Sequence, residues 1–201
     1  MADAVVVPGR MAGPWSPLPL YSGDVAERRG ATVHRFEWTE EPPERPDVPQ
    51  RDWIRLPEVT DWVCGQVTPV LDSVGGSPLL IGKSLGTMLA GVATERSLPA
   101  IWLTPLLIVP SLVDQWRAAT APFLLVGGTA DLAWDSAVAH RLTRYVLEIP
   151  DANHGMYVPG PLSASIAVLD RLIETVDDFL RDIGWPADHP STAGIGPEPV
   201  S

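Results

Sequence analysis

The chain has 201 residues, of which 45% are apolar and 19% are charged, so it is long enough for one domain with a buried core. Its 14 Lys and Arg against 25 Asp and Glu give a net charge of −11, which argues against nucleic acid or an anionic membrane as a partner, because either would repel this surface. The single cysteine, Cys64, excludes an internal disulfide and a cysteine-based zinc cluster.

The N-terminal residues contain no basic stretch followed by a long apolar run, so we expect a cytoplasmic protein without a signal peptide. Six short apolar runs bounded by Pro or Gly then predict strands. These are Val5–Val7, Ala31–Trp38, Leu79–Ile81, Ala100–Leu103, Phe123–Val126 and Tyr145–Ile149. Most are apolar throughout rather than alternating, which is typical of a parallel sheet covered on both faces.

Helical periodicity fills the intervals between these runs. Apolar residues at steps of three and four predict helices over Glu58–Val74, Leu85–Ala93 and Leu162–Ile183. A further helix, ending at Ala119, is expected to start at Ser111, because Ser111 and Asp114 have the spacing of a capping box.

The alternation of strands and helices predicts the domain organisation. We expect one α/β domain over residues 1–183, with a roughly six-stranded, mainly parallel sheet and helices on both faces. The proline-rich segment Glu40–Pro49 is expected to be an extended surface connection, and residues 184–201 are expected to form a flexible tail. In such sheets ligands bind beyond the carboxyl ends of the strands, so residues that follow strands decide the function.

A G-x-S-x-G pattern, Gly82–Gly86, follows the third predicted strand and precedes a helix with an apolar stripe. This is the context of a nucleophile elbow, in which a sharp turn exposes the serine hydroxyl and side chains at the flanking glycines would collide with the strand or helix. Ser84 is therefore the candidate nucleophile.

A serine nucleophile needs a base, and the base needs an acid that fixes its tautomer. His154 directly follows the last predicted strand, so it falls at the same edge of the sheet as the serine. Asp131 follows the fifth strand and is the candidate acid. Asp135, four residues later, is the competing acid, although it is better placed to begin the next helix or to face water.

The oxyanion formed during attack on a carbonyl needs two backbone N–H donors. Leu85 supplies the first, because it follows the nucleophile. The second is expected from the glycine-rich loop after the first strand, with Arg10 as the first candidate and Met11 as the second.

With these motifs in the order Ser, Asp, His, the chain resembles the compact, cap-less α/β hydrolases over about residues 4–182. Two departures from the family's pattern are visible. The two leading antiparallel strands of many members are missing, and Pro8 stands where many members have a His-Gly pair. No segment between the strands is long enough for a cap domain.

The resemblance implies a serine hydrolase, of carboxylesterase or thioesterase type, with an acyl-enzyme intermediate. The expected substrate is a small or medium apolar ester, thioester or lactone, and neither a cofactor nor a metal is expected. Several large side chains are candidates for an apolar pocket over the serine, namely Met11, Trp15, Trp102, Trp134, Met156 and Tyr157. No chemistry is assigned to Lys83.

A second hypothesis is a protein of the same fold that uses this pocket without hydrolysing esters, as a ligand-binding protein, a cyclase or an isomerase. The missing leading strands and the unusual loop after the first strand motivate it. A homodimer is also considered, because Val5–Val7 is expected to be an exposed edge strand that can pair with a second chain.

Overall fold

All six predicted strands form, and they pair in one sheet in which every neighbouring pair is parallel. The computed structural model describes residues 2–11 and 13–186. The strand order is β2-β1-β3-β4-β5-β6. The strands are β1 (Asp3–Val7), β2 (Thr32–Arg35), β3 (Leu79–Lys83), β4 (Ala100–Leu103), β5 (Phe123–Gly128) and β6 (Val146–Ile149).

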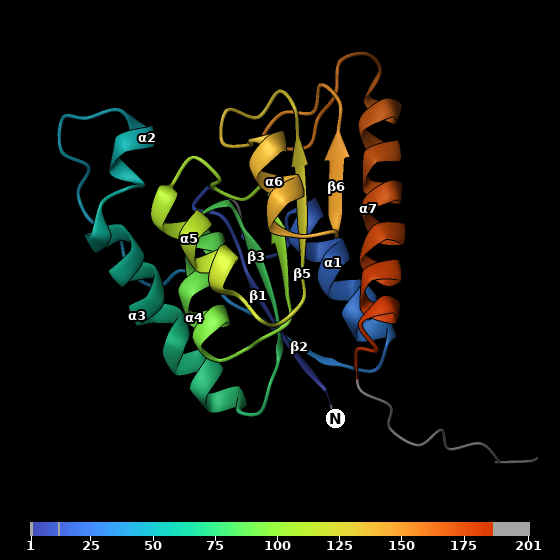
Figure 1. The fold of residues 1–201 in the computed structure, drawn as a ribbon, viewed down its shortest axis with the longest axis horizontal. Helices are drawn as coiled ribbons and strands as arrows, with labels where there is room; N and C mark the ends of the chain where they lie inside the picture. Colours follow the sequence, from blue (N-terminus) through green and yellow to red (C-terminus); the bar gives the residue numbers. More distant parts are fainter. Residues whose placement is uncertain (1, 12, 187–201) are drawn as a thin grey trace, which may run out of the picture.

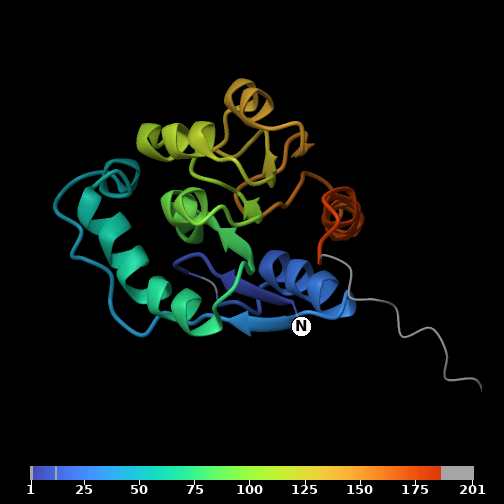
Figure 2. The same ribbon diagram turned by 60° about the horizontal axis from the view of Figure 1, so that its bottom comes forward.

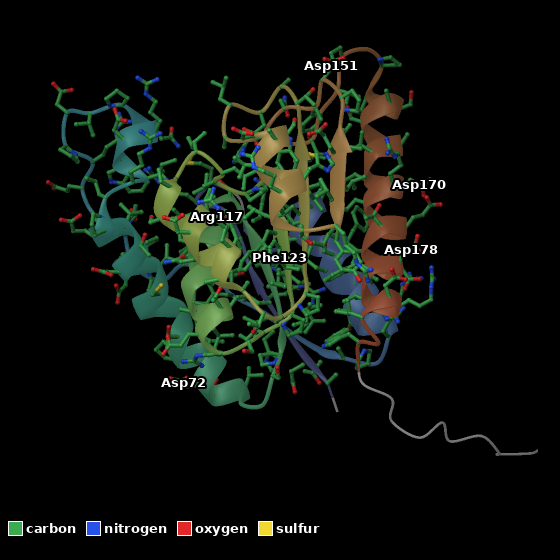
Figure 3. The ribbon with its side chains drawn as sticks, viewed as in Figure 1. Asp72, Arg117, Phe123, Asp151, Asp170 and Asp178 are labelled. Atoms are coloured by element: carbon green, nitrogen blue, oxygen red, sulfur yellow. The ribbon has the colours of Figure 1, made fainter. Side chains whose placement is uncertain are left out.

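Helices cover both faces of the sheet, as predicted (Figures 1 and 2). One face carries α1 (Pro17–Arg28) and α7 (Leu162–Asp182), which lie side by side. The other face carries the remaining helical segments, namely α2 (Gln50–Trp53), α3 (Pro57–Val74), the 3₁₀ helix η1 (Ser84–Leu89), α4 (Ala90–Glu95), α5 (Pro110–Ala118) and α6 (Ser136–Leu142). Charged side chains such as Asp170 and Asp178 point outward from α7 into solvent (Figure 3).

The sheet divides the core into two layers, because successive residues of a strand point to opposite faces. In β3, Leu80 packs toward α3 and α5, whereas Leu79 and Ile81 pack toward α1 and α7. All three side chains are fully buried. A strand buried on both sides explains why the predicted strands are apolar throughout.

Strand β1 lies inside the sheet, so the prediction that Val5–Val7 is an exposed edge is wrong. Val5 is in register with His34 of β2 on one side and with Leu80 of β3 on the other. The first crossover places β2 outside β1, and the next crossover returns the chain to the opposite side of β1. Strand β1 therefore has no free edge that could pair with a second chain. The two edges of the sheet are β2 and β6.

Two predicted boundaries also differ from the structure. Helix α5 begins at Pro110, after Val109 at its N-cap, and no side chain caps it, so Ser111 does not form the expected capping box. Proline fits the first position of a helix because that residue's N–H has no partner within the helix.

The packed part of the chain continues beyond residue 183, where the tail was predicted to start. Trp185 is buried, and its carbonyl oxygen accepts a hydrogen bond of 3.1 Å from Arg29 Nε. The remainder of the predicted tail, residues 187–201, lies outside the described residues. Within residues 2–11 and 13–186, none of the helices combines the length and apolar character needed to span a bilayer.

Candidate active site

The G-x-S-x-G pattern forms a sharp turn between β3 and η1, as predicted. Ser84 has a φ of 50°, a left-handed conformation that non-glycine residues rarely adopt. A Cβ atom on Gly82 would lie 2.7 Å from the carbonyl oxygen of Gly86, and one on Gly86 would lie 2.5 Å from the carbonyl oxygen of Val7. Both glycines are therefore required by close approach of backbone to backbone.

Replacing Gly86 with alanine is expected to destabilise the fold by about 3 kcal/mol, because the new methyl group must displace the backbone of β1. Gly65 provides a matched control. It is exposed in the middle of α3 with open space around its Cα, so Gly65→Ala is expected to raise the free energy of unfolding by about 1 kcal/mol. Urea unfolding of the two variants measures both changes. A Gly86→Ala variant as stable as the native chain contradicts this account of the turn.

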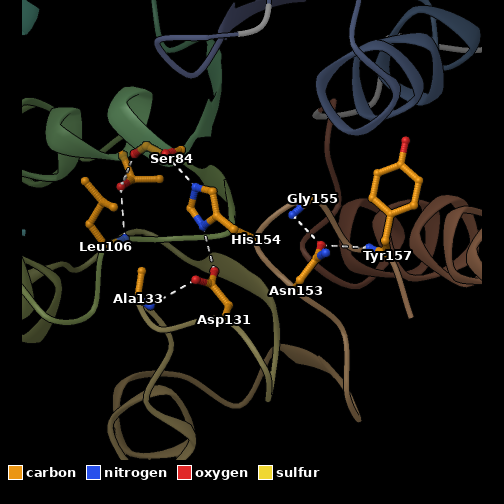
Figure 4. A network of polar contacts seen from close by, with 9 residues as sticks. Ser84, Leu106, Asp131, Ala133, Asn153, His154, Gly155 and Tyr157 are labelled. Carbon is orange, nitrogen blue, oxygen red and sulfur yellow. Dashed lines mark hydrogen bonds and ion pairs between the residues drawn. The ribbon is translucent and has the colours of Figure 1, made fainter. Parts of the chain in front are cut away.

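Ser84, His154 and Asp131 form one chain of hydrogen bonds (Figure 4). His154 Nε2 lies 2.8 Å from Ser84 Oγ, and His154 Nδ1 lies 2.7 Å from Asp131 Oδ2. Asp131 is 6% exposed, and its second oxygen, Oδ1, accepts a hydrogen bond of 2.9 Å from the backbone N–H of Ala133. The structure thus brings together the three residues that the sequence singled out.

The loops that carry the acid and the base are held together directly after β5 and β6. Gly128 packs so tightly on the second loop that a Cβ atom there would lie 2.2 Å from the carbonyl oxygen of Ala152. Ala130 N–H donates to the same oxygen at 3.1 Å, and Asp151 N–H donates to Thr129 Oγ1 at 2.8 Å. The glycine at the end of β5 therefore allows the approach of the two loops.

Asn153 shapes the backbone around the histidine. Its side-chain oxygen accepts hydrogen bonds from Gly155 N–H at 2.9 Å and from Tyr157 N–H at 3.1 Å (Figure 4). An asparagine that accepts from backbone groups two and four residues on stabilises a tight turn. This turn directs the imidazole of His154 toward the serine.

The competing acid, Asp135, has a structural role instead. It is the N-cap of α6, and its carboxylate accepts a hydrogen bond of 2.9 Å from Val138 N–H. This is the usual way in which an aspartate satisfies an otherwise unpaired N–H group in the first turn of a helix.

The loop after β1 reaches the serine at the point where the strand order reverses between β1 and β3, which is where ligands bind in open parallel sheets. A Cβ atom on Gly9 would lie 3.3 Å from Ser84 Cβ, so the segment before Arg10 touches the elbow. The guanidinium of Arg10 extends away and stacks over Trp53 at 5.1 Å. Leu85 is buried in the first turn of η1, where N–H groups lack partners within the helix.

Thr87 is a supporting residue that the sequence analysis missed. Its buried hydroxyl donates a hydrogen bond of 2.6 Å to the carbonyl oxygen of Ser84 and accepts one of 3.4 Å from Leu106 N–H. It thereby ties the elbow to the loop after β4. In the sequence, this role is indicated only by the position of a polar threonine within the apolar stripe of a predicted helix.

A pocket of about 430 Å³ opens beside the triad, between the start of α1, the start of α7 and the loop after β6. Met156 and Tyr157 line it, as predicted, and Leu18, Ile166 and Leu169 contribute further apolar walls. Figure 4 shows the ring of Tyr157 extending toward α1 from the loop that carries His154.

The prediction that Trp102 and Trp134 line this pocket is wrong, because both rings pack in the core. Trp102 is 1% exposed and lies under the elbow, where its ring would be 2.7 Å from a Cβ atom on Gly82. Trp134 fills the space over Gly127, and its indole N–H donates to Glu148 at 2.6 Å.

Met11 and Trp15 are not among the residues that line the pocket either. Met11 is 89% exposed on the loop after β1. Trp15 is 61% exposed, and the guanidinium of Arg35 stacks over its ring at 4.8 Å. Both side chains are largely exposed, and the residue after Trp15, Ser16, lines the pocket instead.

Lys83, to which the sequence analysis assigned no chemistry, lines the pocket directly before Ser84. Burial lowers the pKa of its ammonium group, and the negative charge of Asp131 opposes this change in part. In the described part of the chain, no group of three or more His, Cys, Asp or Glu side chains is placed to hold a metal ion.

These observations define an α/β protein with a hydrogen-bonded Ser-His-Asp chain at a nucleophile elbow. No protein-family model and no curated protein matches the chain. Its fold does match solved structures. Est1E from Butyrivibrio proteoclasticus, in a structure with bound ferulic acid, has a TM-score of 0.66 and 14% identity over 91% of this chain and 89% of its own.

Two bacterial structures extend the similarity. A putative hydrolase of the α/β superfamily from Xanthomonas campestris pv. campestris has a TM-score of 0.62 and 19% identity, over 90% of this chain and 99% of its own. A serine hydrolase without lid from Xanthomonas campestris has a TM-score of 0.57 and 17% identity, over 94% of this chain and 84% of its own. The chain therefore has the α/β-hydrolase fold, in the compact form that its sequence resembles.

Proposed function

We propose that this protein is a serine hydrolase that cleaves a small or medium apolar ester, thioester or lactone through an acyl-enzyme intermediate. The observation that carries the proposal is the pair of short contacts of His154, 2.8 Å to Ser84 Oγ and 2.7 Å to Asp131 Oδ2. Such a pair turns a weakly nucleophilic hydroxyl into an attacking group.

In the proposed reaction, Ser84 Oγ attacks the carbonyl carbon of the substrate while His154 Nε2 takes the hydroxyl proton. Asp131 accepts from Nδ1–H, holds the required tautomer and stabilises the imidazolium. The tetrahedral intermediate then expels the alcohol or thiol, which leaves with the proton from His154. Water, activated by the same histidine, attacks the acyl group on the serine and releases the carboxylic acid.

The backbone N–H groups of Leu85 and Arg10 are the proposed donors to the oxyanion. Leu85 follows the nucleophile, and the loop before Arg10 touches the serine from the opposite side. Because a backbone group donates, the side chain at residue 10 is free to stack on Trp53. Each such donor is worth about 10²–10³ in rate in a comparable serine hydrolase.

The pocket beside the triad supports a substrate with a small or medium apolar part. Its volume of about 430 Å³ falls within the range of small-molecule sites, and its walls are mostly apolar. Est1E and the lid-less Xanthomonas campestris serine hydrolase, which share the fold, support the proposed class of reaction.

A panel of p-nitrophenyl esters and thioesters of increasing chain length tests the proposal. We expect turnover, and we expect the mass of the protein to rise by that of one acyl group when a slowly deacylating ester is used, with the group on Ser84. Acylation at another residue, or tight binding of the esters without acylation, contradicts the proposal. The second result instead favours a ligand-binding, cyclase or isomerase role for the same pocket.

A further inference from the structure

The side of the sheet on which Lys83 lies follows from the alternation of β3. Leu79 and Ile81 face the layer of α1 and α7, so Lys83, two residues further on, faces the same layer. This puts its side chain in the pocket at the end of the strand, one residue before the proposed nucleophile. Lys83 is also the only lysine of the sequence, because every other residue among the 14 Lys and Arg is arginine.

The ammonium group of Lys83 makes no hydrogen bond or ion pair with any residue of the chain that the structure describes. The charge of Asp131 raises the pKa of Lys83, but both carboxylate oxygens of Asp131 are engaged, by His154 Nδ1 and by Ala133 N–H. The positive charge of the Lys83 ammonium is therefore not neutralised by a carboxylate in direct contact with it.

The surroundings of this charge are apolar. Leu18, Met156, Leu169 and other apolar residues form most of the pocket wall. The buried hydroxyl of Ser165 already accepts a hydrogen bond of 3.1 Å from Val158 N–H. Desolvation lowers the pKa of Lys83, which is consistent with an ammonium group that has lost part of its water without gaining a hydrogen bond to the protein.

We propose that the natural substrate is an ester or thioester that carries a carboxylate, and that the Lys83 ammonium binds this carboxylate inside the otherwise apolar pocket. This inference rests on the proposed hydrolase function. A carboxylate brings one negative charge to one positive charge, so the pair is neutral and each group regains part of the hydrogen bonding lost on leaving water. A phosphate, with a charge near −2, would leave excess negative charge among apolar walls.

Lys83 has a second conceivable effect, which the test must separate from substrate binding. Its charge interacts with that of Asp131 through space, so its loss changes the electrostatic field at the Ser84, His154 and Asp131 side chains. An effect of this kind alters the turnover of every ester to the same degree. Binding of a carboxylate alters only the discrimination between anionic and neutral substrates.

A first experiment measures binding without chemistry. Protein labelled with [¹³C]lysine gives signals from one residue, and it is titrated with the monoanilide of glutaric acid and with the neutral valeranilide, since anilides resist hydrolysis. We expect the Lys83 signals to shift with the anionic compound, and its pKa to rise in the complex because a neighbouring anion favours the charged form. Equal shifts with both compounds, or no shift with the anionic one, overturn the proposal.

A second experiment measures discrimination in turnover. Matched pairs of esters carry a terminal carboxylate or a methyl group, on the acyl side in one pair and on the alcohol side in the other. We expect kcat/KM of the native chain to favour the anionic member of at least one pair. Lys83→Met is expected to lower this preference about 10- to 100-fold, and Lys83→Arg is expected to retain most of it.

The proposal is overturned if the native chain prefers the anionic ester in neither pair. It is also overturned if Lys83→Met has the same preference for the anionic ester as the native chain. Failure of the hydrolase function is recognised separately, because a fluorophosphonate probe reports whether Ser84 is reactive at all. The anilide titration of the native protein decides the role of Lys83 even if Ser84 is unreactive or a variant does not fold.

Discussion

Replacing Ser84 with alanine is expected to abolish ester turnover and labelling by a fluorophosphonate. The removed oxygen is the atom that lies 2.8 Å from His154 Nε2, so no other group receives the help of the base. Loss of the nucleophile in a comparable triad lowers kcat by about 10⁶. The fold is expected to persist, since alanine and serine have the same restrictions at a φ of 50°.

The measurement is the rate of p-nitrophenyl ester hydrolysis together with the stoichiometry of labelling, and circular dichroism checks the fold. Ser111→Ala is the matched control, because Ser111 is an exposed serine in the first turn of α5, away from the elbow. It should be labelled to the same extent as the native chain. Equal labelling of Ser84→Ala and the native chain rejects Ser84 as the nucleophile.

Asp131→Asn is expected to produce the second largest loss, about 10⁴ in kcat, as the equivalent change does in a serine protease. The asparagine either presents its amide group to His154 Nδ1, which forces the imidazole into the wrong tautomer, or leaves the imidazolium without a negative partner. The backbone contact from Ala133 N–H to Oδ1 is compatible with an amide oxygen, so the loop is expected to hold its shape.

Asp135→Asn provides the control for this prediction. Asparagine caps a helix about as well as aspartate, so the bond from Val138 N–H and the activity should both persist. Steady-state kinetics of the two variants with one ester provide the comparison. If Asp135→Asn were the more damaging change, or if Asp131→Asn retained native kcat, the assignment of the acid would be wrong.

The strands and the meeting of Ser84, Asp131 and His154 at one edge of the sheet were predictable because they depend on local signals. A buried parallel strand is a short apolar run, and a residue that follows such a run lies at the active edge of the sheet, whichever neighbours the strand has. Ser84, Asp131 and His154 could therefore be placed without knowing the strand order. The same reasoning separated Asp135 from Asp131, because Asp135 precedes a helical segment.

The strand order itself was not predictable from these signals. Whether β1 lies at an edge or inside depends on the direction of two crossovers, and the apolar pattern of Val5–Val7 is the same in either case. The capping box at Ser111 failed for a related reason, since Pro110 can begin the helix one residue earlier without a side-chain cap.

The pocket was predicted only in part, because being large and near the end of a strand does not fix the direction of a side chain. Met156 and Tyr157 follow β6 and reach the pocket, but Trp102 occupies the position of β4 that faces α5. Trp134 is drawn over Gly127, where the absent Cβ leaves room for a ring. Lys83 was missed as a pocket residue. The sequence already shows that it follows Leu79 and Ile81 at steps of two residues, so it lies on the same face of the strand.

The two layers of the core differ in how readily they accept amino-acid substitutions. The α3–α5 layer includes η1, which begins at Ser84, whereas the α1–α7 layer opens at one end into the pocket. Leu162 and Ile166 line this pocket and are 67% and 56% exposed, so replacing them disturbs little packing. Changes at these two positions can therefore reshape the pocket while Ser84, Asp131 and His154 keep their contacts.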